Sequence, residues 1–329
     1  MKQILLIISF ALIAAGSIIL ITIYYKEKNT FLSPLVSETE NPKHPLDKYT
    51  FENLKNTNFP KKDFAITDQI SQNPLYTSNI FVMRNNTSSV SGLINIPKTK
   101  KPLGTIILIR GYVDREVYES GMGTKRIGEK LASNGFVTVS PDFLGYGTSS
   151  WPSGDPLEER FQTYTTVLSL INSLPENLPS KIGLFGHSNG GHIAIAALEV
   201  TGRNFPAVLW APVSKPFPYS ILYYTDEFDD KGKALRKLVS NFEKDYDVFK
   251  YSIDNYLDWI NAPLQINQGL ADQEVPYWWS DELVQTLKDK NKEVEYYKYP
   301  GEDHNFNGGT WDILAARTLN FYLKHFTKP

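Results

Sequence analysis

From about residue 79 onward, the apolar positions change from a two-residue alternation to short continuous runs. Residues 79–84 and 90–97 alternate on either side of a turn at residues 85–89, which predicts a β-hairpin. The later runs are uninterrupted and most end in glycine or proline, as expected of strands buried on both faces. These runs occupy residues 104–111, 136–147, 181–188, 207–212, 262–269 and 293–301.

Helical patterns lie between most of these runs. They cover residues 127–132, 157–174, 191–200, 278–291 and 310–326. Strands that alternate with helices predict an α/β fold with a mostly parallel central sheet, helices on both faces and the hairpin antiparallel at one edge. Residues 213–261 interrupt this alternation and are rich in Tyr, Phe, Asp and Lys. A connection of this length predicts a small helical insertion.

The N-terminal residues 1–25 are almost continuously apolar from Ile4 to Tyr25. At roughly 1.5 Å per residue this stretch is long enough to cross a hydrocarbon layer of about 30 Å. We therefore expect a transmembrane anchor, with the catalytic domain on the extracytoplasmic side. A signal peptide cleaved after Gly16 remains the alternative. Residues 26–58 are rich in Pro, Asn, Lys and Glu and predict a flexible spacer before a folded domain over residues 59–329.

Composition and charge narrow the classes of function. The 329 residues are 41% hydrophobic and carry a formal net charge of −2, without the basic surface typical of nucleic-acid-binding proteins. Cysteine is absent, which excludes disulfides, thiolate metal sites and a cysteine nucleophile. The five histidines do not follow the HExxH spacing of zinc hydrolases. We expect no metal and no cofactor.

The segment GHSNGG at residues 186–191 places Ser188 in a G-x-S-x-G motif between a buried strand and a helix. Such a turn is so tight that it has no room for a Cβ atom at positions 186, 190 and 191, which are therefore Gly186, Gly190 and Gly191. The serine hydroxyl points outward. Ser188 is therefore the predicted nucleophile.

A serine nucleophile needs a base and an acid, which follow it in the order serine, acid, histidine in this kind of fold. His304 lies in the loop after the strand at residues 293–301, and Asp272 lies three residues after Gly269. We assign the base to His304 and the acid to Asp272. Four other residues are expected to have no catalytic part: Asp303 as a solvated loop residue, His325 on the last helix, His187 pointing elsewhere and His192 in helix packing.

Three segments, GHSNGG, GLADQEVP at residues 269–276 and YPGEDH at residues 299–304, resemble the catalytic loops of the α/β-hydrolase superfamily. They are most similar to those of prolyl-oligopeptidase-like serine peptidases and dienelactone-hydrolase-like esterases. The resemblance covers about residues 80–326. It implies an oxyanion hole formed by the backbone N–H groups of Tyr112 and Asn189. The Tyr112 side chain is an alternative donor. Arg110 replaces a common histidine and is expected to brace this loop, and recognition of an anionic substrate is the alternative.

The chain is therefore expected to be a serine hydrolase that cleaves an ester or a peptide bond through an acyl-enzyme, with a prolyl-oligopeptidase-like peptidase favoured. A carboxylesterase, an acyltransferase and a catalytically silent, membrane-tethered binding module remain alternatives. The expected substrate is a small ester or a short peptide. Aromatic residues of the insertion either bind an apolar or ring-bearing group of the substrate or form a small core of their own, and the oligomeric state stays open. We expect the loop at residues 142–150 to shape the rim of the active site.

Overall fold

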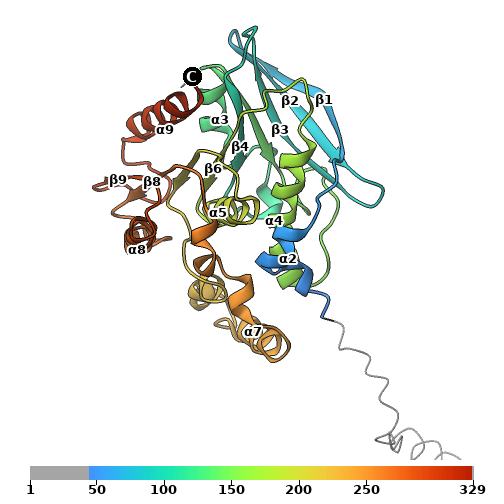
Figure 1. The fold of residues 1–329 in the computed structure, drawn as a ribbon, viewed down its shortest axis with the longest axis vertical. Helices are drawn as coiled ribbons and strands as arrows, with labels where there is room; N and C mark the ends of the chain where they lie inside the picture. Colours follow the sequence, from blue (N-terminus) through green and yellow to red (C-terminus); the bar gives the residue numbers. More distant parts are fainter. Residues whose placement is uncertain (1–43, 328–329) are drawn as a thin grey trace, which may run out of the picture. The chain divides into compact units, whose positions relative to one another are not determined.

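The computed structural model describes residues 44–327, and their centre is one nine-stranded sheet (Figure 1). The strand order is β1-β2-β3-β5-β4-β6-β7-β8-β9. The first three strands are antiparallel, β3 is antiparallel to β5, and all pairs from β5 to β9 are parallel. The predicted α/β fold is therefore confirmed. The strands are β1 Asp63–Gln72, β2 Tyr76–Arg84, β3 Ser89–Pro97, β4 Gly104–Ile109, β5 Phe136–Pro141, β6 Ile182–His187, β7 Ala207–Trp210, β8 Leu264–Gly269 and β9 Val294–Tyr299.

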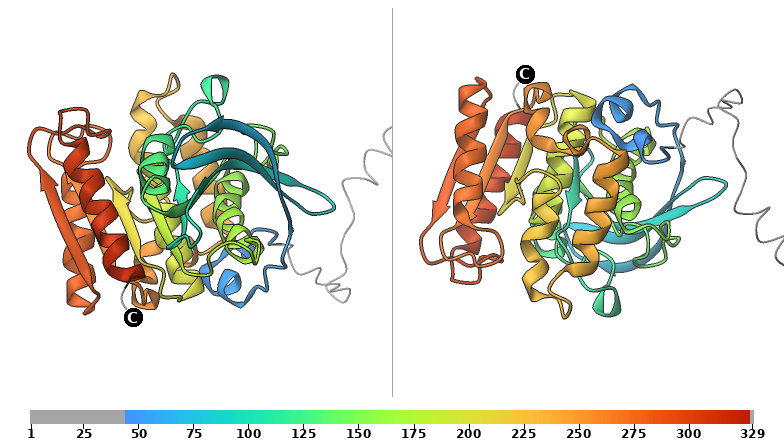
Figure 2. Two further views of the ribbon diagram at one scale, coloured as in Figure 1. Left: turned by 90° about the horizontal axis from the view of Figure 1, so that it is seen from above. Right: turned by 90° about the horizontal axis from the view of Figure 1, so that it is seen from below.

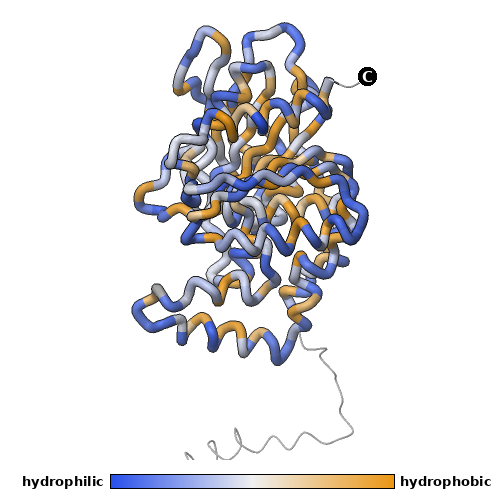
Figure 3. The backbone as a smooth tube through the Cα atoms, turned by 90° about the vertical axis from the view of Figure 1, so that its left-hand side faces the viewer, coloured by the Kyte–Doolittle hydropathy of each residue, from blue (hydrophilic) through white to orange (hydrophobic). Residues whose placement is uncertain are grey.

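Helices cover both faces of the sheet (Figures 1 and 2). Successive residues of a strand point to opposite faces, so Ile106 and Leu108 of β4 belong to the core with α3 and α9, whereas Ile107 and Ile109 belong to the core on the other face, which α4, α5 and α8 cover. Figure 3 shows the hydrophobic stretches concentrated in the interior of this sandwich. The helices are α3 Lys125–Ala132, α4 Pro156–Ser173, α5 Asn189–Thr201, α8 Tyr277–Asp289 and α9 Trp311–Phe326.

Two elements in front of the predicted domain boundary belong to the fold. The short helix η1 Asp47–Tyr49 and helix α2 Phe51–Asn56 lie within the segment that the sequence indicated as spacer, and a compact unit begins at Pro45. Phe51 is fully buried and stacks on Tyr256, with ring centroids 4.9 Å apart. The domain boundary near residue 59 is therefore wrong. The sequence does not predict these elements because most of their residues are polar, and only Tyr49, Phe51 and Leu54 face the core.

Strand β1 is also absent from the sequence-based expectation. Its side chains are exposed or half-buried along its whole length, because β1 is the edge strand of the sheet. An edge strand of this kind carries little of the apolar alternation from which strands are predicted.

The expected insertion connects β7 to β8 and is helical. Its aromatic residues divide into two groups. Phe217, Phe242 and Tyr251 pack around Phe161 of α4 and form part of the main core, whereas Tyr219, Tyr223 and Phe228 are exposed. The elements are α6 Tyr219–Leu222, η3 Tyr223–Glu227, α7 Lys233–Asp245, η4 Val248–Tyr251, η5 Ile253–Asn255 and η6 Leu257–Trp259.

The membrane anchor expected over residues 1–25 lies outside the described residues and stays a prediction. Within residues 44–327, no helix is both long enough and apolar enough to cross a membrane.

Candidate active site

Ser188 occupies the turn between β6 and α5 in a strained backbone conformation, with φ 57° and ψ −124°. Its N–H donates to the Trp210 carbonyl at 2.9 Å, which holds the turn against β7. A Cβ atom at Gly190 would lie 2.1 Å from the Ile109 oxygen, and one at Gly186 would lie 2.5 Å from the Gly190 oxygen. The glycines are therefore required by the close approach of α5 to the end of β4.

The structure places Asp272 and His304 in direct contact. Nδ1 of His304 lies 2.9 Å from Oδ2 of Asp272 and donates to it, since a carboxylate accepts. The other Asp272 oxygen accepts from the N–H groups of Glu274 and Val275, and Oδ2 also accepts from Gln268 Nε2. The Asp272 side chain is fully buried, whereas that of His304 is 12% exposed. This arrangement fixes the imidazole so that Nε2 is free for proton transfer.

A close approach of two loops brings these residues together. A Cβ atom at Gly269 would lie 2.4 Å from the carbonyl oxygen of Glu302, so only glycine allows the end of β8 to contact the loop that carries His304. The buried carboxylate of Glu302 accepts from the N–H groups of Gly308 and Thr310, at 2.7 Å each, and orders the same loop.

His187 contacts the predicted base, contrary to the expectation that it points elsewhere. Its Nε2 lies 2.9 Å from the main-chain oxygen of His304, and the two rings are 4.7 Å apart. Because a carbonyl only accepts, Nε2 carries the proton. Burial, and next the charge that His304 acquires on protonation, lower the pKa of His187 to about 4. His187 is therefore neutral near pH 7, and Ser188 directly follows a residue that touches His304.

No hydrogen bond joins Ser188 Oγ to His304 in the part of the chain that the structure describes. Such a bond is often long before substrate binds and tightens in the reacting complex.

The two predicted oxyanion donors lie on either side of the serine. Asn189 is the first residue of α5, so its N–H has no acceptor within the helix. The Tyr112 N–H donates to no described residue, and a Cβ atom at the preceding Gly111 would lie 3.4 Å from Ser188 Oγ. The Tyr112 side chain is 76% exposed, and its hydroxyl donates to Asp114 at 2.7 Å. The geometry therefore favours the backbone amide over the side chain as the donor.

Arg110 braces the loop that carries Tyr112. Its Nη1 donates to the Gly111 oxygen at 2.8 Å and its Nη2 to the Asp142 oxygen at 3.0 Å. The guanidinium lies 4.0 Å from the ring centroid of Tyr146 and 4.6 Å from that of Tyr118. The buried Asp142 carboxylate accepts from three hydroxyl groups, those of Ser91, Tyr118 and Ser120. Asp142 thereby connects the loop at residues 142–150 to the oxyanion loop.

Four aromatic side chains form a cluster beside the loop that carries Asp272. Trp279 is buried, and the ring of Tyr223 lies 4.8 Å and that of Tyr219 6.0 Å from its ring. Tyr224 packs against the same tryptophan and against Val275, whose N–H bonds to Asp272. We call Tyr219, Tyr223, Tyr224 and Trp279 the aromatic cluster.

The structure also gives the positions of three other residues that the sequence set aside from catalysis. Asp303 accepts from the N–H groups of Asn305 and Asn307 within its own exposed loop. His192 is buried, with Nδ1 bonded to the Val213 oxygen and Nε2 to the Tyr164 hydroxyl, at 3.0 Å each. His325 is half-buried at the end of α9, the last helix.

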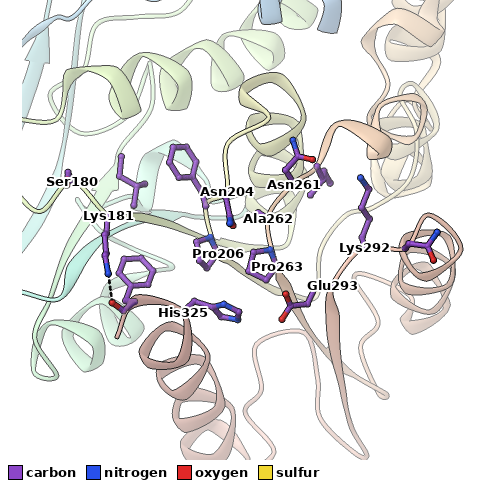
Figure 4. A pocket seen from close by; sticks show the side chains of 15 residues that line it. Ser180, Lys181, Asn204, Pro206, Asn261, Ala262, Pro263, Lys292, Glu293 and His325 are labelled. Atoms are coloured by element: carbon purple, nitrogen blue, oxygen red, sulfur yellow. Dashed lines mark hydrogen bonds between the residues drawn. The ribbon is translucent and has the colours of Figure 1, made fainter. Parts of the chain in front are cut away.

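A cavity of about 590 Å³ lies at the opposite end of the sheet from Ser188 (Figure 4). Residues at the amino ends of β6 to β9 line it, among them Lys181, Pro206, Pro263 and Glu293. None of Ser188, Asp272 and His304 lines this cavity, which is therefore separate from the candidate active site.

Comparison with known proteins gives a consistent result. A family model, described as the prolyl oligopeptidase family, matches residues 129–329, a range that contains Ser188, Asp272 and His304 but begins after the oxyanion loop. The uncharacterized peptidase YtmA of Bacillus subtilis is 26% identical over 227 residues, which cover 66% of this chain and 82% of that protein.

Solved structures share the fold. Acetyl xylan esterase 1 from Thermoanaerobacterium sp. superposes with a TM-score of 0.57 at 16% identity, over 85% of this chain and 94% of that one. A puromycin-hydrolyzing peptidase of Mycobacterium tuberculosis superposes with a TM-score of 0.57 at 20% identity, over 78% of this chain and 41% of the other.

Proposed function

Because the chain belongs to the prolyl oligopeptidase family and is a serine hydrolase of the α/β-hydrolase fold, we propose that Ser188, His304 and Asp272 cleave a peptide or ester bond through an acyl-enzyme. The observation that carries this proposal is the 2.9 Å bond between Asp272 and His304, beside a strained serine at the end of β6. A peptidase acting on short peptides is favoured by the family, and an esterase is the second candidate.

In this mechanism Ser188 Oγ attacks the carbonyl carbon while His304 Nε2 takes the hydroxyl proton. The N–H groups of Tyr112 and Asn189 stabilise the oxygen that becomes negative, and the positive end of α5 points to the same place. His304 then returns the proton to the leaving amine or alcohol as the bond to the carbonyl breaks. Water attacks the acyl-enzyme by the same steps, and Ser188 regains its proton.

The aromatic cluster supports a substrate with an apolar or ring-bearing group next to the cleaved bond. Tyr219 and Tyr223 are partly exposed, and the cluster is joined to the Asp272 loop through Val275. A group that binds against these rings would therefore lie beside the loop that carries Asp272.

Labelling with a fluorophosphonate probe tests the assignment of the nucleophile. We expect the wild-type protein to be labelled on Ser188 and Ser188→Ala to remain unlabelled with an unchanged melting temperature. Failure of the wild-type protein to react would favour a silent binding module. A peptidase and an esterase are then separated by comparing proline-site peptide nitroanilides with short nitrophenyl esters, and product analysis with added alcohols or amines detects acyl transfer.

A further inference from the structure

Arg160 is a half-buried cation without an acidic partner among the described side chains. It lies near the start of α4, at the end of the sheet where Ser188 also emerges. None of the ion pairs of residues 44–327 includes it. Its Nε is buried without a hydrogen-bond partner, and Nη2 lies 3.4 Å from Ser220 Oγ.

A charge that is partly removed from water and not paired costs free energy. Arg160 nevertheless lies at the end of the sheet where Ser188 emerges, although a neutral side chain would fill the same space. Such an arrangement is expected where the partner of the charge arrives with a ligand.

A short chain of contacts connects Arg160 to the nucleophile. Arg160 interacts with the hydroxyl of Tyr164, one turn along α4, and that hydroxyl lies 3.0 Å from His192 Nε2. His192 Nδ1 donates to the carbonyl oxygen of Val213. The N–H of Val213 in turn donates to the main-chain carbonyl oxygen of Ser188 at 3.0 Å. His192 supplies no negative charge, so none of these described contacts neutralises Arg160.

A second set of contacts connects Arg160 to the catalytic acid. Tyr224 packs against the buried Val213 and Val275, and Val275 N–H donates to Asp272. Burial is the main cause that raises the pKa of Tyr224; the charge of Asp272 raises it further and the charge of Arg160 lowers it. The contact of Arg160 with Ser220, which directly follows Tyr219 of the aromatic cluster, places the guanidinium beside the insertion.

We propose that Arg160 binds a carboxylate of the substrate, so that the preferred substrates are those whose acyl part ends in a carboxylate. A guanidinium pairs with a carboxylate through two parallel hydrogen bonds, and the accessible part of the half-buried Arg160 side chain would supply these donors. This inference rests on the proposed hydrolytic function, and it adds the chemical class of the substrate to it.

The test compares charged and neutral esters of equal length. Mono-4-nitrophenyl adipate and pimelate carry a free carboxylate, and their methyl esters do not. We expect Arg160→Gln to lower kcat/KM for the charged esters by about 10- to 100-fold, as for a lost hydrogen bond to a charged group, and for the methyl esters by less than about threefold. Arg160→Lys should keep part of the preference. Arg115→Gln, which removes an exposed arginine paired with Glu159, is the matched control and should leave the preference unchanged.

A binding measurement makes the outcome independent of turnover. Adipate or pimelate should raise the melting temperature of Ser188→Ala and should not raise that of Ser188→Ala/Arg160→Gln. Equal losses for both kinds of ester, or a thermal shift that survives Arg160→Gln, would overturn the carboxylate site. If the wild-type protein hydrolyses neither ester and resists the fluorophosphonate probe, the hydrolytic proposal fails, and the thermal shift alone then decides the assignment of Arg160.

Discussion

The ring of His187 lies 4.7 Å from that of His304 at an angle of 33°, and its Nε2 donates a 2.9 Å hydrogen bond to the His304 carbonyl oxygen. His187 immediately precedes Ser188, so this bond joins the strand that carries the proposed nucleophile to the loop that carries the proposed base. Asp272 holds the same imidazole through Nδ1. His304 is therefore fixed both at its ring and at its main chain.

Replacing His187 with phenylalanine keeps a ring against His304 and removes the donor. We expect kcat to fall about 5- to 10-fold, the effect of one hydrogen bond, with KM changed less than twofold, because only the alignment of the base is affected. Steady-state kinetics on a chromogenic substrate measure both constants. A wild-type kcat in His187→Phe would show that the bond does not position the base.

The Arg110 guanidinium fixes the direction of the Tyr112 N–H. The carbonyl of Gly111 and the N–H of Tyr112 belong to one trans peptide and point in opposite directions, so a carbonyl held by Nη1 aims the N–H away from the arginine. We expect Arg110→Met to lower kcat by up to about 100-fold, approaching the loss of one oxyanion donor. Arg110→Lys keeps the charge without the two-point contact and should lie in between. The melting temperature of each variant separates this effect from unfolding.

Two glycines provide a test of the turn that carries Ser188. Gly190→Ala would place a Cβ atom 2.1 Å from the Ile109 oxygen, so α5 must move away from β4. We expect loss of nearly all activity and a destabilisation of about 1–3 kcal/mol, typical of overpacking. Gly154→Ala is the control, since no atom lies within 4 Å of the added carbon. Thermal denaturation and probe labelling of both variants give the comparison, and an active Gly190→Ala protein would contradict the tight turn.

Glu199 of α5 is fully buried, and neither carboxyl oxygen has a hydrogen-bond partner among the described residues. Burial, followed by the charge of Asp254, raises the pKa of Glu199 well above its ordinary value of 4.5. Below pH 4.5 the group is protonated in the folded and unfolded chains alike. As the pH rises further, only the unfolded chain ionises, so the free energy of unfolding falls until the folded pKa is passed.

Replacing Glu199 with leucine should therefore stabilise the protein, by about 1–3 kcal/mol for the unsatisfied carboxyl group and by more at pH 8 than at pH 5. Melting temperatures across this pH range check the prediction. Glu176→Leu, at a side chain that is 92% exposed, is the matched control and should show no such dependence. A melting temperature of Glu199→Leu below that of the wild-type protein at pH 8 would show that the carboxylate is paired in solution.

The parallel sheet and the turn that carries Ser188 could be predicted because their signals are local. A buried strand such as β6 is apolar throughout, and the tight turn after it demands glycines within a few residues of Ser188. The contact between Asp272 and His304 follows from topology, since β8 and β9 are adjacent and parallel and both residues come after their carboxyl ends.

The features of the fold and the site that the sequence did not predict depend on contacts between residues that are distant in the sequence. The direction of the His187 side chain is set by a loop 117 residues away. Helix α2 is short and polar, and its place is fixed by contacts such as that between Phe51 and Tyr256. Whether an acidic side chain lies beside Arg160 depends on several elements that are distant in the sequence. The sequence pattern therefore could not predict that Arg160 has no ion pair within residues 44–327.

The early start of the folded unit affects how any assay should be set up. A recombinant protein trimmed to begin at residue 59 would lack Phe51 and Leu54, leaving Tyr256 and the flank of α5 uncovered, and it would lose the bond from Tyr49 to Glu158 of α4. Such a fragment would aggregate or remain inert for reasons unrelated to chemistry. Recombinant proteins that begin no later than Pro45 avoid mistaking a damaged hydrolase for an inactive one.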